Sequence, residues 1–416
     1  MRRGLQIRIA RRIRRFRQVR RIVKRATIIF SLLLCVIALA LFAWLYSSLP
    51  ATRGNLALSG IGTAVEIARD AHGVPTVTAS SQHDAVFALG FLHAQDRLFQ
   101  MDLRRRFAAG RLSEVMGTAA LASDKWMRTL GLYRLAAASL PRQSESFQAT
   151  LVAYADGVNS YLAVRRGALP LEFTLLGYSP EPWQPADTLV LGKLLQLELS
   201  GNFRGELLKA SLVKKLSPDT VQELFPNHPK LDPTVVSRLS DLYRSLPVGE
   251  MLAGVPREAG PAYASNSWVV DGRHTDSGKP LLANDPHLGF GAPGVWYLCR
   301  IEAPGLTLSG ATIAGAPLVV LGHNREIAWG FTATISDVED LFVEQLDPAD
   351  NGRYLGPDGS HPFEIRSEKI DVRGAPPATI ALRSTRHGPV VSDAAAGLAG
   401  NAGSGHVSYN AYLANP

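Results

Sequence analysis

The sequence changes character at Ala264-Ser265-Asn266-Ser267-Trp268-Val269-Val270-Asp271-Gly272. The residues before it are patterned mostly as helices, and those after it form short strand-like runs separated by turn signals. Ser265 stands between a Gly/Pro-rich lead, residues 258–264, and an alternating apolar run. We interpret Ser265 as a residue that becomes a new N-terminus and acts as a nucleophile, with its own α-amino group as base. The alternative is an ordinary loop serine before a strand.

This change divides the chain into five predicted parts. A basic tail covers residues 1–25, an apolar segment 26–46, a helical region 47–245, an exposed linker 246–264, and a β-rich region 265–416. Helices are predicted over 83–116, 121–166 and 186–225. Strands are predicted over 266–271, 279–283, 295–302, 306–314, 317–322, 327–333, 341–345, 363–372 and 378–384, with two earlier ones at 64–70 and 76–79. The sequence therefore predicts an α+β protein.

The positive charge of the chain is concentrated in the tail. The formal net charge is +8, but residues 1–25 hold twelve Lys and Arg and no Asp or Glu. The remainder carries 32 basic against 36 acidic side chains. A body with this balance lacks the basic surface typical of nucleic-acid binding, so we exclude that class of function.

The apolar segment 26–46 carries no charged side chain, and a helix that spans a bilayer needs about 20 such residues. Trp44 and Tyr46 stand where interfacial aromatic residues are expected. The basic flank predicts a cytoplasmic N-terminus and a body on the periplasmic or extracellular side of the inner membrane. A cleaved signal peptide is the alternative, although its apolar core is usually about 7–15 residues long.

Several residues suggest other chemistry and are better explained structurally. The two cysteines, Cys35 and Cys299, form no disulfide framework, and Cys299 is predicted to be a core residue. Ser211 and Lys214 have S-x-x-K spacing without the accompanying motifs. The G-x-G-x-x-G match at 289–294 contains a proline and is followed by a strand instead of a phosphate-binding helix.

One polar group lies in the predicted helix 83–116. His93, Asp96 and Arg97 are candidates for catalysis, but such a run on a helix more often makes interfacial hydrogen bonds and ion pairs. We therefore expect a structural role for them.

A set of motifs in a fixed order then becomes informative. After Ser265-Asn-x-Trp-Val-Val come Asn284-Asp-Pro-His287, Leu321-Gly-His-Asn-x-x-Ile-Ala-Trp-Gly-x-Thr-Ala333 and Asp337-Val-Glu-Asp340. Upstream stand Arg69-Asp-x-x-Gly-Val-Pro75, Ala94-Gln-Asp-Arg-Leu-Phe-Gln-Met101 and Trp183-x-Pro-x-Asp187. Over roughly residues 60–410, the chain resembles the penicillin acylase (penicillin amidase) family of N-terminal nucleophile hydrolases.

The resemblance implies an αββα fold made by a helical small-subunit region and a β-rich large-subunit region, preceded here by one transmembrane helix. It implies autocatalytic cleavage before Ser265, giving an α/β heterodimer, and hydrolysis of a linear amide through an acyl-Ser265 intermediate. An α-amine with a pKa of about 7.7–8.0 is partly neutral at physiological pH, which suits a base. The backbone N–H of Ala333 is implied as an oxyanion donor.

Further roles follow from the same resemblance. His287 is expected to hydrogen-bond the nucleophile or the substrate, through its backbone or its ring, with a purely structural histidine as the alternative. Asp337, Glu339 and Asp340, together with Glu206 from the small-subunit region, match a structural Ca²⁺ site, since clustered carboxylates suit this hard cation. The alternative for the acidic residues is a solvated turn.

Leu288 and Leu321 match aromatic pocket positions of phenylacetyl-specific members. Leucine at these positions favours an aliphatic acyl group, so an N-acyl-homoserine lactone or a lipopeptide-type amide is a candidate substrate beside a penicillin. The family's further oxyanion asparagine has no counterpart before Pro416, so the chain is expected to be truncated. An unprocessed relative or fragment with only a binding or structural role is the non-enzymatic alternative.

Overall fold

The structure, a computed structural model, describes residues 2–200, 202–213, 215–225, 264–289, 291–333, 338–394 and 406–411. These residues form two compact units. The first unit comprises Met1–Asn55 and Arg165–Leu175, and the second comprises Leu56–Val164 and Leu176–Pro416. The predicted linker 246–264 lies outside the described residues except for Ala264, so its exposure stays a prediction.

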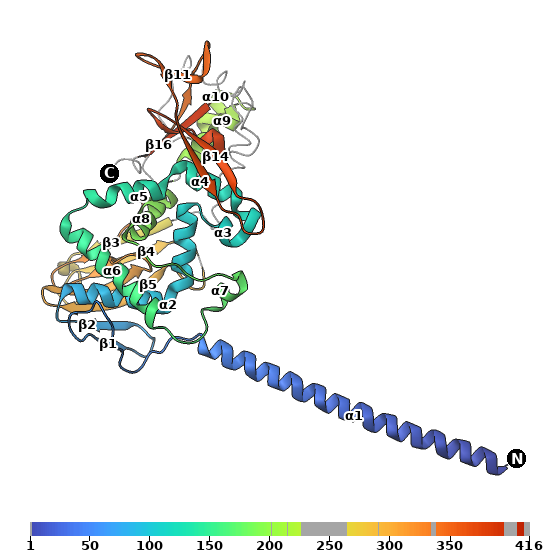
Figure 1. The fold of residues 1–416 in the computed structure, drawn as a ribbon. Coiled ribbons are helices and arrows are strands. Elements are labelled where there is room, and N and C mark those ends of the chain that lie inside the picture. Colours follow the sequence, from blue (N-terminus) through green and yellow to red (C-terminus); the bar gives the residue numbers. More distant parts are fainter. Residues whose placement is uncertain are drawn as a thin grey trace. The chain divides into compact units, whose positions relative to one another are not determined.

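The first unit is dominated by α1 (Arg2–Ser47), a single helix in which the basic tail and the apolar segment are continuous (Figure 1). Its part from Gln18 to Ser47 contains an 18-residue stretch with a mean hydropathy of 2.9 and is long enough to cross a membrane. The large side chains of this part, such as Leu32, Leu39 and Phe42, are exposed. By length and composition, α1 is therefore a candidate membrane span, and a signal sequence has the same properties.

The helices of the second unit precede Ser265, as the sequence predicts. Their bounds are α2 (Gln82–Ala109), α3 (Ser113–Met116), α4 (Leu121–Leu130), α5 (Leu132–Ser139), α6 (Glu145–Val164), α8 (Pro185–Ser200), α9 (Asn202–Val213) and α10 (Pro218–Leu224), while α7 (Leu171–Leu176) lies at the border of the two units. Short 3₁₀ turns occur at Gly117–Ala120, Leu140–Arg142, Gly272–His274 and Val391–Ala394.

Helices α2 and α6 pack at very close range. A Cβ atom at Gly90 would overlap the backbone of Tyr154, and one at Gly157 would overlap the backbone of Phe87. Only glycine leaves room for this approach, so the two positions fix where the helices cross. Leu89 and Leu151 are almost completely buried and belong to the core that these helices form.

A buried ion-pair network sets the start of α8. Arg105 on α2 donates to Asp102 and to Asp187 at the first turn of α8, the latter at 3.0 Å. The same guanidinium donates to the Pro182 carbonyl at 3.0 Å and lies over the Trp183 ring. Because buried charges need such partners, this network ties α8 to α2.

The largest sheet has the strand order β1-β2-β5-β6-β7-β8. Its strands are β1 (Glu66–Arg69), β2 (Pro75–Thr78), β5 (Trp296–Ala303), β6 (Leu306–Ile313), β7 (Val319–His323) and β8 (Ala328–Trp329). All neighbours are antiparallel except β2 and β5, which pair in parallel with Thr76 opposite Arg300. Strands from both sides of Ser265 thus share one sheet.

Four smaller sheets complete the second unit (Figure 1). They pair β3 (Ala264–Val270) with β4 (Leu281–His287), β9 (Glu339–Glu344) with β16 (His406–Ala411), β10 (Leu346–Asp347) with β11 (Asp350–Gly356) and β12 (Gly359–Pro362), and β13 (Glu364–Ile370) with β14 (Ala378–Thr385) and β15 (Gly388–Pro389).

The predicted order of helices followed by strands is confirmed, and the chain is a mixed helix and sheet protein. The αββα layering stays a prediction. The strand predicted at 327–333 is wrong in length, since only Ala328–Trp329 pairs and the following residues turn toward the pocket described below. The hairpin of β11 and β12 was not predicted, because its strands are polar and lack apolar alternation.

Candidate active site

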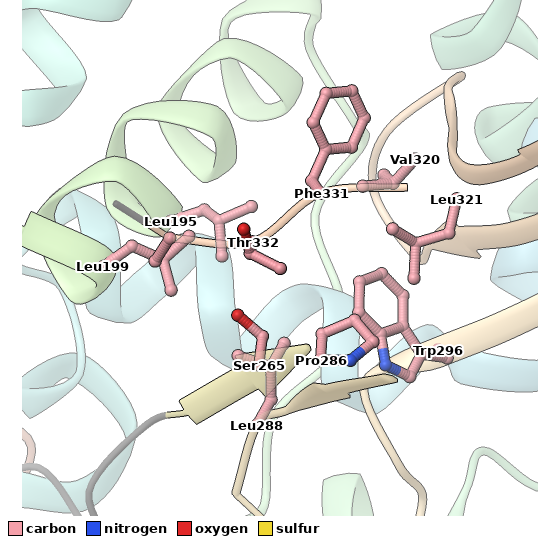
Figure 2. A pocket seen from close by; sticks show the side chains of 11 residues that line it. Leu195, Leu199, Ser265, Pro286, Leu288, Trp296, Val320, Leu321, Phe331 and Thr332 are labelled. Atoms are coloured by element: carbon pink, nitrogen blue, oxygen red, sulfur yellow. The ribbon is translucent and has the colours of Figure 1, made fainter. Parts of the chain in front are cut away.

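Ser265 lies in a cavity of about 360 Å³ formed almost entirely by apolar side chains. Figure 2 shows its side chain beside Thr332, with Leu195 and Leu199 on one side and Trp296 and Leu321 on the other. The lining residues are Leu195, Leu199, Ser265, Pro286, Leu288, Trp296, Val320, Leu321, Phe331, Thr332 and Ala333. Four predicted site residues, Ser265, Leu288, Leu321 and Ala333, are therefore brought together.

The strand pairing explains how these residues converge. Ser265 in β3 stands opposite Pro286 in β4, and directly opposed residues of an antiparallel pair point to the same face. Leu288 follows Pro286 by two positions and lines the same cavity. Helix α8 adds Leu195 and Leu199, which lie one turn apart on one face.

The cavity is suited to an uncharged apolar group. Among the described residues that line it, the polar side-chain groups are the hydroxyls of Ser265 and Thr332 and the indole N–H of Trp296, and no lining side chain is charged. The part of a ligand that enters this cavity is removed from water. It lies beside Ser265, the candidate nucleophile, and the backbone of Ala333. Pockets of this kind typically surround the apolar part of a small molecule and hold few polar groups that fix its orientation.

The ring of His287 contacts Asp285, and a contact between this ring and the substrate stays a prediction. His287 follows Pro286 directly, so strand alternation turns its side chain away from the face that lines the cavity. Its Nε2 atom lies 3.0 Å from the Asp285 carboxylate, and both side chains are exposed. A contact between the His287 backbone and the nucleophile or the substrate stays a prediction.

Two of the predicted calcium ligands, Glu206 and Glu339, have hydrogen-bond partners within the protein. The Glu206 carboxylate in α9 accepts the backbone N–H of Leu341 in β9 at 3.2 Å. Glu339 begins β9 and is 0% exposed, and its carboxylate accepts the Ser200 hydroxyl at 2.5 Å. Asp340 is exposed, and Asp337 lies outside the described residues. Within the described ranges no three His, Cys, Asp or Glu side chains are grouped closely enough to hold a metal.

His93 is completely buried in a hydrogen-bonded chain that joins α2, α6 and the large sheet. The Gly315 N–H donates to the Tyr154 oxygen, which lies 2.7 Å from His93 Nδ1. His93 Nε2 lies 2.9 Å from the Thr312 hydroxyl, which donates to the Tyr297 carbonyl. Since the Thr312 proton is used there, Nε2–H donates and Nδ1 accepts from Tyr154. Burial and the nearby positive charge of Arg97 lower the pKa of His93 to about 3.

The neighbours of His93 also have structural contacts. The Asp96 carboxylate lies 2.9 Å from Arg69 and accepts the Tyr297 hydroxyl at 2.6 Å. Arg97 has non-helical backbone angles and lies over the Tyr297 ring. Cys299 is buried, and burial raises the pKa of its thiol to about 11, so it stays neutral. These observations agree with the structural interpretation of all four residues.

Sequence reasoning missed part of the site. Leu195, Leu199 and Trp296 line the cavity, and no motif singled out the two leucines. Asn284 was noted only as part of a motif, yet its side chain bonds to the backbone at Asn266 and Phe331. The spacing of the two leucines on one helical face predicts that they are buried. It does not predict which segment they pack against.

Comparisons with known proteins place the chain in a family. The sequence family described as penicillin amidase matches residues 64–414. The chain is 36% identical over 359 residues to acyl-homoserine lactone acylase QuiP of Pseudomonas aeruginosa, covering 83% of this chain and 42% of that protein. It is 34% identical over 364 residues to penicillin acylase 2 proenzyme of Pseudomonas sp. strain SE83, covering 84% and 46%.

A solved thermostable penicillin G acylase from Alcaligenes faecalis is 30% identical and covers 41% of this chain and 97% of the solved chain, with a TM-score of 0.35. The chain thus spans less than half the length of the two curated relatives named above.

Proposed function

Because the chain belongs to the penicillin amidase family, we propose that it is an amide hydrolase whose nucleophile is Ser265. Cleavage of the Ala264–Ser265 bond exposes the α-amine that serves as base. The observation that carries the proposal is the single apolar cavity that contains both Ser265 and Ala333. Relatives named acylases at 36% and 34% identity support the same class of reaction.

In the proposed reaction, the Ser265 hydroxyl adds to the amide carbonyl carbon of the substrate, and its proton passes to the α-amine. The Ala333 N–H donates to the oxyanion that develops on the carbonyl oxygen. The carbon–nitrogen bond then breaks, and the α-ammonium returns the proton to the leaving amine. Water attacks the resulting ester by the same route and releases the carboxylic acid.

For the substrate, we propose an amide with an aliphatic acyl group. The cavity near Ser265 is lined by four leucines and a valine beside the aromatic Trp296 and Phe331, and no lining side chain is charged. The support for an alkyl chain is that Leu288 and Leu321 stand at the two positions where leucine favours an aliphatic acyl group. An N-acyl-homoserine lactone is the first candidate, and a penicillin is the second. Comparing hydrolysis rates for acyl chains of increasing length with that for a phenylacetyl amide separates them, and a preference for phenylacetyl would contradict the aliphatic assignment.

We also propose a structural Ca²⁺ ion held by Glu206, Glu339, Asp340 and Asp337. The chemistry of the donors supports it, since two carboxylates from α9 and β9 come close to one strand end and one of them is fully buried. The ion would offset the charge of Glu339 and join the two regions of the chain. It takes no part in the reaction above.

The setting of the enzyme follows from α1. We propose that α1 anchors the protein in the inner membrane, with the basic tail in the cytoplasm and the second unit on the periplasmic or extracellular side. The helical and the β-rich regions would remain together as an α/β heterodimer after cleavage. A cleaved signal peptide is the alternative, and the mass of the purified N-terminal fragment distinguishes the two.

The first experiment is intact mass measurement with N-terminal sequencing, on the wild type and on Ser265→Ala. A new N-terminus that reads Ser-Asn-Ser-Trp in the wild type and is absent from the variant is the expected result. An acyl adduct on that serine after incubation with a slow substrate completes the assignment. An uncut wild-type chain without acylation would contradict the proposal and favour the binding or structural role.

A further inference from the structure

The side chain of Asn284 joins the two parts of the site that come from different sheets. Ser265 belongs to the two-stranded sheet of β3 and β4, whereas Ala333 follows β8, which belongs to the six-stranded sheet. Catalysis at Ser265 needs the oxyanion donor at a fixed distance from the nucleophile. A contact that joins the two sheets beside Ser265 and Ala333 could therefore fix the distance between them.

Three hydrogen bonds make this contact. The Asn284 amide nitrogen donates to the Asn266 carbonyl at 2.8 Å and to the Phe331 carbonyl at 3.1 Å. Its amide oxygen accepts the Phe331 N–H at 3.0 Å. Asn266 directly follows Ser265, and Phe331 stands two residues before Ala333. One side chain thus holds the backbone beside the nucleophile against the backbone beside the oxyanion donor.

The approach of the two segments also needs a glycine. A Cβ atom at Gly330 would lie 2.6 Å from the Asn284 amide oxygen and 2.6 Å from its Cβ. Such distances force one side to move, so any side chain at Gly330 would push Asn284 away from Phe331. The backbone of Gly330 and the side chain of Asn284 therefore form one contact, and a change in either residue disrupts it.

We propose that Asn284 is a positioning residue for amide hydrolysis, which sets the spacing between Ser265 and the Ala333 N–H. The inference rests on the proposed function. Asn284 is not itself among the residues that line the cavity, so its main effect is expected on the position of the Ala333 N–H and hence on the chemical step. Asparagine suits the task because it donates and accepts at once, and aspartate of the same shape lacks the two donated bonds.

The test compares Asn284→Asp and Gly330→Ala with the wild type. Rates are expressed per reactive Ser265, counted by titration with an acylating label. We expect kcat to fall about 10-fold to 100-fold in each variant, because a displacement of about 1 Å in an active site can cost about 100-fold. KM should stay within about twofold. The double variant should be no slower than the slower single variant, since both changes break one contact.

Asn159→Asp is the matched control. The Asn159 side chain donates to the Trp183 carbonyl at 3.0 Å and accepts the Trp183 N–H at 2.7 Å, which is the same bidentate pattern away from the cavity. Its kcat per reactive Ser265 should equal that of the wild type. If kcat also falls in this control, the loss in Asn284→Asp is a general effect of removing a bidentate contact. That result would overturn the proposal.

The remaining outcomes are also distinct. Unchanged kcat in Asn284→Asp would overturn the positioning role while leaving the proposed function standing. Loss of the wild-type melting transition in that variant would also overturn it, because Asn284 would then be a residue required for folding. A wild-type protein that neither cuts itself nor forms an acyl-serine would fail the proposed function itself.

Discussion

Acid should destabilise this protein through His93. In the folded chain, His93 is neutral, with its pKa lowered from 6.5 to about 3. In the unfolded chain it titrates at its ordinary pKa of about 6.5. The unfolded state therefore takes up a proton first, and the free energy of unfolding falls as the pH drops below this value.

The expected magnitude follows from these two pKa values. Lowering the pH from about 7.5 to about 5 should reduce the free energy of unfolding by about 2 kcal/mol through this one residue. This free-energy difference changes little if the pKa of His93 in the folded chain is one unit higher, because at these pH values His93 titrates only in the unfolded chain. Protonation in the folded state is resisted because Nδ1 accepts from the Tyr154 hydroxyl, which lies 2.7 Å away.

Urea unfolding at both pH values, followed by tryptophan fluorescence in detergent, measures this difference. His93→Gln keeps a donor and an acceptor but cannot titrate, so its fall in stability should be smaller than that of the wild type by about 2 kcal/mol. His72→Gln, at an exposed position, should keep the full wild-type fall. Equal falls in the wild type and in His93→Gln would refute the reasoning.

Three other expectations concern separate parts of the molecule. Gly157→Ala should lower the free energy of unfolding by about 1–3 kcal/mol in urea, because its methyl group overlaps the Phe87 backbone, and an unchanged midpoint would contradict the close packing. EDTA should lower the melting temperature of the wild type but have little effect on Glu206→Gln, and an equal shift in both would argue against calcium at this carboxylate. Leu199→Phe should reduce kcat/KM for the longest acyl chain that is accepted by about 10-fold or more and spare short chains, and a uniform loss across chain lengths would contradict its place in the acyl cavity.

Part of the site was predictable because its residues belong to motifs that follow Ser265 in a fixed order. The family resemblance placed Leu288 and Ala333 with the nucleophile, and both line the cavity. Strand alternation contained the information that His287 faces away, since it stands between Pro286 and Leu288. The expectation for its ring came from the resemblance alone, and its contact with the substrate stays a prediction.

The contribution of α8 was not predictable from the sequence. Leu195 and Leu199 reach the cavity because α8 is anchored by Asp187 to Arg105 on α2, a contact between residues 82 positions apart. Helical periodicity predicts that such a face is buried, but the segment that covers it depends on packing between distant parts of the chain. The bonds of Asn284 to Phe331 have the same origin, since they span 47 positions and follow no repeating pattern.

The parallel pair of β2 and β5 has a consequence for assembly. Thr76 and Arg300 are partners in one sheet, although the proposed cut at Ser265 falls between them in the chain. Before the cut, the connecting peptide acts as a tether that gives the two segments a high effective concentration for pairing. After the cut, the same sheet joins two separate polypeptides, so its re-formation after denaturation becomes a bimolecular process. Refolding of the processed protein should depend on its concentration, whereas refolding of uncut Ser265→Ala should not.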